Sequence, residues 1–294
     1  MTTSTLSVEK HVENLKGTRI ESIDLLRGIV MIIMALDHVR DYFHADAFLF
    51  NPLDLTRTSV PLYFTRWITH FCAPVFVFLA GTSAFLVGQR KGKSELSSFL
   101  LKRGLWLLVL EFTVINFSWF FNLRFSFFAL TVIWALGIGM IALAAASRLP
   151  FKAILVLGVI MVAGHNLLDG VHVSGSGAPA VGWAVLHEAK AFTLGSIILY
   201  VGYPIIPWTG LMLLGYCFGT WYRREVPATE RKKFLLATGS SLIIGFVVLR
   251  LINSYGELSA WSSQNNAVYT MLSFLNVTKY PPSLLYVLVT IGPA

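Results

Sequence analysis

The apolar stretch at residues 23–44 carries more ionisable side chains than a simple membrane helix would. Each such group inside a bilayer costs about 2.5 kcal/mol or more on insertion scales, so these groups usually face a bundle interior or a watery cavity. The cluster therefore indicates a functional site. One arginine lies near the start of the stretch and the other members crowd its end: Arg27, Asp37, His38, Arg40, Asp41 and His44.

The spacing of these residues brings acids and histidines within reach of one another on a helix. Asp37, Asp41 and His44 share one helix face, and His38 lies three residues before Asp41. A carboxylate beside an imidazole fixes its tautomer and raises its basicity. We therefore predict a general base or nucleophile that works near neutral pH, oriented by a carboxylate. The alternative is that the charges only neutralise one another at a helix end.

Composition and hydropathy indicate a membrane protein around this site. The chain of 294 residues is 55% hydrophobic and 13% charged, with a mean hydropathy of +0.68, which is unlike a soluble domain. About 20 apolar residues cross a bilayer, and we predict an all-α polytopic transmembrane helical bundle of about eight spans. The expected spans are 23–44, 67–88, 97–117, 125–147, 151–167, 203–222 and 233–252, with an eighth beginning near Ser283.

The basic residues predict the orientation of the bundle. Of the 23 Lys and Arg residues, sixteen fall on the side of the N-terminus and seven on the opposite side. The positive-inside rule then places the N-terminus in the cytoplasm. The net charge of +8 is explained by this topology, so no nucleic-acid partner is expected. We divide the chain into a cytoplasmic N-terminal segment, 1–22, and a membrane domain, 23–294.

Several connections also have predicted roles. Residues 167–190 form the longest outer loop, and 191–202 is apolar but too short to span, so we expect it to be interfacial or re-entrant. The pair Gly215 and Gly219 allows close helix contact. Only about 12 residues follow Pro281-Pro282, too few for a complete span, so we expect the C-terminus to be truncated with at least one further span missing.

Six motifs in order resemble the bacterial relatives of heparan-α-glucosaminide N-acetyltransferase. The resemblance runs over nearly the whole chain. The ten residues between Arg27 and His38 also look like the Arg-x10-His signature of the broader membrane acyltransferase superfamily. The motifs are RIESIDLLRGIVMIIMALDHVRDYF at 19–43, PVFVFLAGTSAFL at 74–86, LLKRGLWLLVLEFTVINFSW at 100–119, LHEAKAF at 186–192, YPIIPWTGLMLLGYCFG at 203–219 and KYPPSLLYVL at 279–288.

The resemblance implies a polytopic acyltransferase of the bacterial inner membrane. Such an enzyme takes an acetyl group from cytoplasmic acetyl-CoA and passes it to a small-molecule or glycan acceptor, often a sugar. In the superfamily, the histidine at the position of His38 is the catalytic base or acyl-handling residue. The human enzyme has Asn there and an active histidine nearer His44, so both candidates stay open and we favour His38. The acceptor, the acyl chain, N- or O-acylation and a homo-oligomeric state are left open.

The same resemblance suggests roles for residues outside the first span. Arg27, Lys102 and Arg103 lie on the cytoplasmic side, where they would bind the phosphates of coenzyme A; topology marking is the alternative for the last two. Glu111 lies midway in its span, so its carboxyl is expected to be either protonated or paired with Arg27 or Arg103, in a functional role or as a polar link between helices. Glu111, Asn116 and His187 are the candidates for contact with the acceptor.

Two other functional classes remain to be weighed. A proton- or solute-coupled transporter would use the same Asp, His and Arg cluster, but a carrier would not bind or hydrolyse acetyl-CoA. A metal site could combine Asp37, Asp41 and His44 with His165 or Asp169. No metal-specific spacing is present, so no metal is expected.

Overall fold

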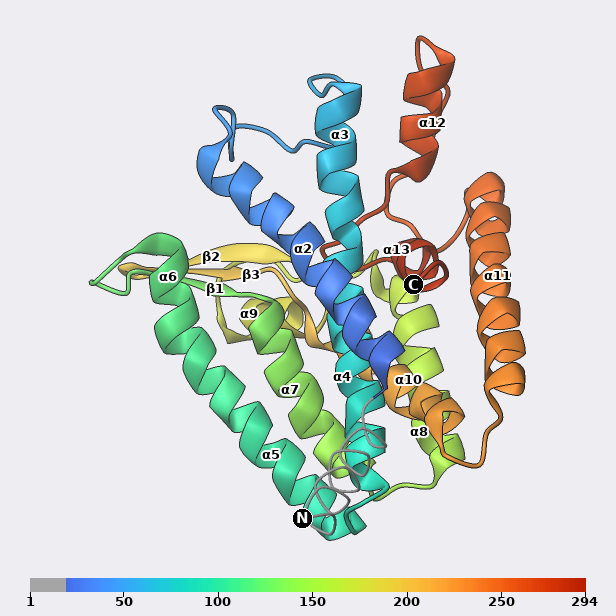
Figure 1. Cartoon of the computed structure of the whole chain (residues 1–294). Helices are drawn as coiled ribbons and strands as arrows, with labels where there is room; N and C mark the ends of the chain where they lie inside the picture. Colours follow the sequence, from blue (N-terminus) through green and yellow to red (C-terminus); the bar gives the residue numbers. More distant parts are fainter. Residues whose placement is uncertain (1–19) are drawn as a thin grey trace, which may run out of the picture.

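The computed structural model describes residues 20–294, so most of the predicted segment 1–22 lies outside the described residues. Helices dominate the described part (Figure 1). Their bounds are α2 (Glu21–Phe43), α3 (Val60–Trp67), α4 (Cys72–Gly88), α5 (Lys93–Leu110), α6 (Asn116–Phe120), α7 (Val132–Ala146), α8 (Phe151–Ala163), α9 (Ala178–Leu186), α10 (Ile205–Phe218), α11 (Ala228–Ile252), α12 (Ala267–Leu275) and α13 (Leu284–Ile291).

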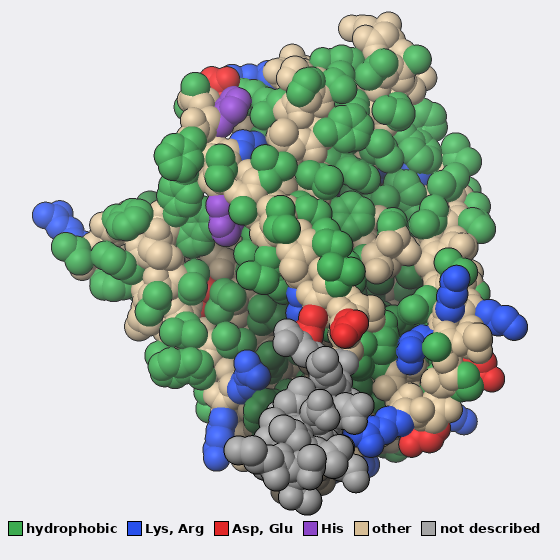
Figure 2. Space-filling model, viewed as in Figure 1, with side chains coloured by type: hydrophobic (Ala, Val, Ile, Leu, Met, Phe, Trp, Pro, Cys, Tyr) green, Lys and Arg blue, Asp and Glu red, His purple; other side chains and the backbone are tan. Residues whose placement is uncertain are grey.

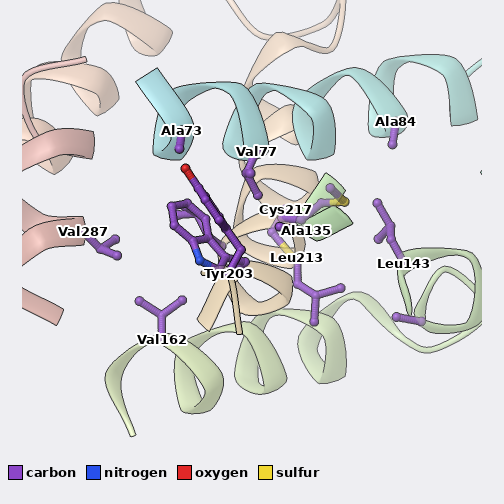
Figure 3. Packing of buried hydrophobic residues seen from close by; sticks show 14 of the residues in the cluster. Ala73, Val77, Ala84, Ala135, Leu143, Val162, Tyr203, Leu213, Cys217 and Val287 are labelled. Atoms are coloured by element: carbon purple, nitrogen blue, oxygen red, sulfur yellow. The ribbon is translucent and has the colours of Figure 1, made fainter. Parts of the chain in front are cut away.

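Helix α10 is the centre of the core and packs against α4, α7 and α8. Glycines let α4 and α10 approach closely, because a Cβ on Gly215 would lie 2.0 Å from the Phe78 carbonyl oxygen. A Cβ on Gly219 would lie 2.6 Å from the Phe85 Cβ. The close contact predicted from Gly215 and Gly219 is therefore confirmed. Beside it, Tyr203 lies in the buried cluster of Figure 3, its ring centroid 4.9 Å from that of Trp208.

A small sheet lies beside this core, so the all-α prediction is confirmed only in part: the described chain is mostly helical but not entirely so. Strand β3 (Ile197–Val201) is central, between β1 (Phe127–Leu130) and β2 (Lys190–Leu194). β1 runs parallel to β3, with Phe127 opposite Ile198, and β2 runs antiparallel to β3. The apolar residues of 191–202 satisfy most of their backbone groups by strand pairing.

The hairpin turn and helix α9 complete this part of the fold. Gly195 in the turn between β2 and β3 has φ +63, a left-handed conformation that glycine adopts without steric cost. Helix α9 forms within the predicted outer loop 167–190 and packs Ala180 and Ala184 against Phe192 and Val201 of the sheet. The predicted span 125–147 begins with β1, so only its α7 part is helical.

The other predicted spans fall on helices, but their number as membrane crossings is not confirmed. By length and composition, two helical runs of the described chain could cross a membrane, Val60–Gly88 with 29 residues and Ala228–Ile252 with 25. Helices α7 and α8 are apolar but shorter than the roughly 20 residues that a span requires. Helix α2 has 23 residues, but acidic and basic groups interrupt its apolar run.

The two ends of the bundle differ in their charges. Helices α5 and α11 both begin at the lower end of Figure 1, and both begin in basic sequence. Figure 2 shows Lys and Arg side chains gathered at that end, whereas hydrophobic side chains cover most of the middle. The eighth predicted element begins as expected, because Ser283 caps α13 by accepting a hydrogen bond from the Tyr286 backbone N–H.

Candidate active site

A cavity of about 980 Å³ opens beside the second half of α2, in the upper part of Figure 1. Its wall is shared by α2, the loop that follows α2, the start of α4, β1 and the segment before α13. Histidine side chains appear on this side of the molecule in Figure 2. The cavity brings together four residues predicted for catalysis, which are Asp37, His38, Asp41 and His44.

The two carboxylates pair with arginines and not with histidines, which corrects the predicted Asp–His arrangement. Asp37 accepts hydrogen bonds from Arg66 Nη1 at 2.9 and 3.2 Å and from Thr69 Oγ1 at 2.9 Å. Arg40 donates to Asp37 and also to Asp41, the latter at 2.9 Å. A guanidinium offers a permanent charge and several donors, so it outcompetes an imidazole for these oxygens. The site is thus an arginine–carboxylate network beside the histidines.

His38 and His44 occupy different depths of the cavity wall. The His38 ring meets the Trp119 ring edge-on, with centroids 5.0 Å apart, and Trp119 stacks on Tyr42. His44 is exposed, and its Nδ1 accepts the Asp46 backbone N–H at 3.2 Å. His38 therefore has a more sheltered position with its ring held by aromatic packing, while His44 lies at the rim.

A third imidazole, that of His70, also lines the cavity. His70 is 1% exposed, and its Nδ1 has no hydrogen-bond partner among the described residues. Its ring packs against Tyr286, whose hydroxyl donates to the His70 carbonyl oxygen at 2.8 Å. Most of the His70 environment is thus structural.

The predicted coenzyme A residues do not come together around this cavity. Arg27 donates to the Leu79 carbonyl oxygen and to Ser83 Oγ of α4, and lies 3.7 Å from Asp24. Lys102 and Arg103 are exposed on α5, where the Arg103 guanidinium lies over a ring of its own helix. Among the described residues, none of the three contacts another or lines the cavity.

Glu111 and Asn116 bind backbone instead of lining the cavity. Glu111 is fully buried and accepts the Thr131 N–H at 2.5 Å and the Thr131 hydroxyl at 3.1 Å. The predicted pairing with Arg27 or Arg103 was therefore wrong. Asn116 bridges to Ala129 through both its amide oxygen and its amide nitrogen. Both side chains connect the helical run α5–α6 to β1, Asn116 at Ala129 within the strand and Glu111 at Thr131 just after it.

His187 lies away from the cavity in a separate buried cluster. Its Nε2 is 2.7 Å from the His165 carbonyl oxygen, 3.4 Å from His165 Nδ1 and 3.5 Å from Asp169 Oδ1. The acceptor contact predicted for His187 therefore has no support from the cavity lining.

Sequence reasoning missed three cavity residues that the segments before α12 and α13 supply. Lys279 is 7% exposed and lies over the Tyr280 ring, with no carboxylate paired to it among the described residues. Burial opposes ionisation of Tyr280, but the cations of Lys279 and Arg66 outweigh it and hold the pKa of this phenol below its ordinary value. Glu257 accepts hydrogen bonds from Thr278 and Ser283. The sequence did offer one signal for these cavity residues, because Lys279 lies directly before a buried apolar run.

The fold and the site define a helical protein with a broad apolar surface and a charged cavity. The chain belongs to the family of the heparan-alpha-glucosaminide N-acetyltransferase catalytic domain, whose family model matches residues 19–249. The predicted relationship is thus confirmed, and membership indicates an acetyltransferase-type function in a membrane-associated family. The match includes α2 and its histidines and ends before Lys279. A comparison with curated proteins finds no match.

Proposed function

We propose that the protein is a membrane-integral acetyltransferase that moves an acetyl group from acetyl-CoA to an amine or hydroxyl of an acceptor, with a sugar as the expected class. The observation that carries this proposal is the cavity, because it places His38 in a sheltered wall together with buried cations. Family membership supplies the reaction class. The acceptor would enter the cavity from the α2 end opposite to Arg27.

In the proposed reaction, His38 accepts the proton of the acceptor nucleophile. The nucleophile then forms a bond to the acetyl carbon, the carbon–sulfur bond breaks, and the proton passes to the leaving coenzyme A thiolate. A route through acetyl-His38 has the same overall balance. The network of Asp37, Arg40 and Arg66 holds α2 against α3 and so positions the imidazole. His44 at the rim is the second candidate for the base.

The donor would be bound at the other end of α2. Arg27 lies eleven positions before His38, which is roughly 16 Å along a helix at 1.5 Å per residue. Arg27, Lys102 and Arg103 are cations of the predicted cytoplasmic end and suit phosphate groups. Arg27 is already held by α4, so it would offer its remaining donors, while the exposed pair on α5 would move to the ligand.

A bilayer around the bundle accounts for its apolar surface. Helix α11 is apolar along most of its length, and only 11% of its 18-residue hydrophobic stretch is buried inside the protein. Ile244, Val248 and Leu251 are exposed at 62%, 47% and 59%. Patches of this kind on soluble proteins are covered by a partner or a membrane. We propose a multi-pass protein of the cell membrane with the basic end, and hence the N-terminus, in the cytoplasm.

The test measures transfer by purified protein in lipid vesicles supplied with labelled acetyl-CoA and a panel of amino sugars. We expect His38→Ala to lose labelled product while still binding acetyl-CoA, and the matched exposed-histidine variant His172→Ala to keep full transfer. Full transfer by His38→Ala together with loss in His44→Ala would exchange the two roles. If the wild-type protein neither binds nor consumes acetyl-CoA, the acetyltransferase proposal fails and the transporter alternative is favoured.

A further inference from the structure

A buried group of nitrogen and oxygen ligands lies outside the cavity, where the turn after α8 meets the end of α9. His165 is 2% exposed and His187 is 3% exposed, while the Asp169 side chain is 16% exposed. One ligand atom from each of the three residues lies within 4.8 Å of the others. None of these residues lines the large cavity, so the group has no part in the proposed transfer reaction.

The cluster has a buried polar atom that the described part of the protein leaves unsatisfied. Asp169 Oδ1, which lies 3.5 Å from His187 Nε2, has no hydrogen-bond partner among the described residues. Each unsatisfied buried group costs about 1–3 kcal/mol. A ligand bound among these residues would remove this free-energy cost by pairing with the unsatisfied atom.

Two of the three separations between ligand atoms match a tetrahedral metal centre, and the third is within 4.8 Å. Metal–ligand bonds of about 2.0–2.1 Å in a tetrahedron place neighbouring ligand atoms about 3.3–3.4 Å apart. Here His187 Nε2 is 3.4 Å from His165 Nδ1 and 3.5 Å from Asp169 Oδ1. An octahedral centre with similar bonds would need about 2.9 Å. Two imidazoles and one carboxylate are also a set that zinc accepts and calcium or magnesium does not favour.

We propose that His165, Asp169 and His187 form a structural zinc site. When its Nε2 is protonated, His187 donates to the His165 carbonyl oxygen; on metal binding that proton would move to Nδ1 and leave the Nε2 lone pair for the metal ion. A water would be the fourth ligand.

Neighbouring side chains hold the ligands in place. Asn166 Nδ2 donates to Asp169 Oδ2 at 2.7 Å, leaving Oδ1 for the metal, and Asn166 Oδ1 accepts the Leu284 N–H at 2.9 Å. The Trp183 ring stacks on the His187 ring. Because supporting contacts of this kind orient metal ligands, the site would tie α8 and α9 to the first turn of α13.

The test uses the full chain purified in detergent without an affinity tag that binds metal. Zinc is measured by mass spectrometry after equilibration with buffered zinc, and thermal unfolding is followed with and without chelator. We expect one zinc per chain in the wild type, a lower melting temperature after chelation and recovery with zinc. Asp169→Asn should weaken zinc binding by more than tenfold, and Asn166→Ala by about 10–100-fold.

The matched control is His172→Ala, because His172 is an exposed histidine of the same segment, 66% exposed and paired only with Glu188. It should bind zinc as the wild type does. Cobalt added to the wild type should give the intense visible absorption of a tetrahedral centre. Zinc well below one equivalent in the wild type, or equal zinc in Asp169→Asn, would overturn the proposal. If a variant fails to fold, the comparison of the wild type with and without chelator still tests the proposal.

Discussion

Replacing Asp37 by Asn distinguishes a structural carboxylate from a catalytic one. In the structure this carboxylate is the shared anion of two arginines, with Arg40, Arg66 and Asp37 side chains 8%, 16% and 13% exposed. Asn keeps one acceptor oxygen for Thr69 but removes the charge. The two guanidinium groups are then left buried without their full counter-charge.

The expected cost follows from that geometry. Opposite charges about 4 Å apart attract by about 4 kcal/mol at an effective dielectric constant of 20, and breaking a buried pair on one side typically costs 3–5 kcal/mol. Because Asp41 still pairs with Arg40 and Asn retains a hydrogen bond, we expect a loss near the lower limit, about 3 kcal/mol. The transfer activity per folded molecule should fall much less than in His38→Ala.

The assay is thermal and denaturant unfolding of the detergent-purified protein, followed by transfer rates normalised to folded protein. Asp46→Asn is the control, because Asp46 is exposed and its side chain makes no ion pair among the described residues; it should leave stability unchanged. In a double-mutant cycle with Arg66→Gln, we expect a coupling of about 0.5–3 kcal/mol. Unchanged stability in Asp37→Asn together with abolished transfer would refute the reasoning and restore the carboxylate to the chemistry.

Two further substitutions test the packing that supports the site. Gly215→Ala should destabilise the protein by about 1–3 kcal/mol in the unfolding assay, because its Cβ would lie 2.0 Å from the Phe78 carbonyl oxygen. The control Gly28→Ala should be neutral or slightly stabilising in the same assay, because a Cβ at Gly28 would have nothing within 4 Å. Arg250→Lys should cost about 1.5–3 kcal/mol, because Arg250 donates to the carbonyl oxygens of Ser259, Ser273, Phe274 and Asn276. Accelerated proteolysis between α11 and α13 should accompany that change, and an unaltered cleavage pattern would argue against this role.

Local sequence signals predicted the helices well and the small sheet poorly. Apolar length and the basic flanks indicated most helix positions, because both depend on neighbouring residues only. The sheet was missed because residues paired between β1 and β3 are 71 positions apart, with Phe127 opposite Ile198, and no local pattern shows such a pairing. The Gly195-Ser196 pair between two apolar runs was a hairpin signal, but the overall hydropathy favoured a membrane interpretation.

For the site as well, helix spacing predicted which residues lie together, but it did not predict the partners that other segments contribute. Spacing along α2 correctly grouped Asp37, His38, Asp41 and His44, because all four line one cavity. The predicted Asp–His pairing was wrong, because Arg40 of the same helix binds both carboxylates and Arg66 of α3 also binds Asp37. A helical pattern shows which groups can meet on one face, but it does not show which cation of another segment reaches them first.

The competition for carboxylates explains why the unpaired imidazoles carry the proposed chemistry. With Asp37 and Asp41 both bound to arginine, His38 has aromatic neighbours and no anionic partner among the described residues. Such a histidine can exchange its proton with an acceptor nucleophile as well as with a leaving thiolate. The arginine network then contributes by fixing α2 against α3, so that rigidity of the helix, and not a relay to the imidazole, holds the base in the cavity wall.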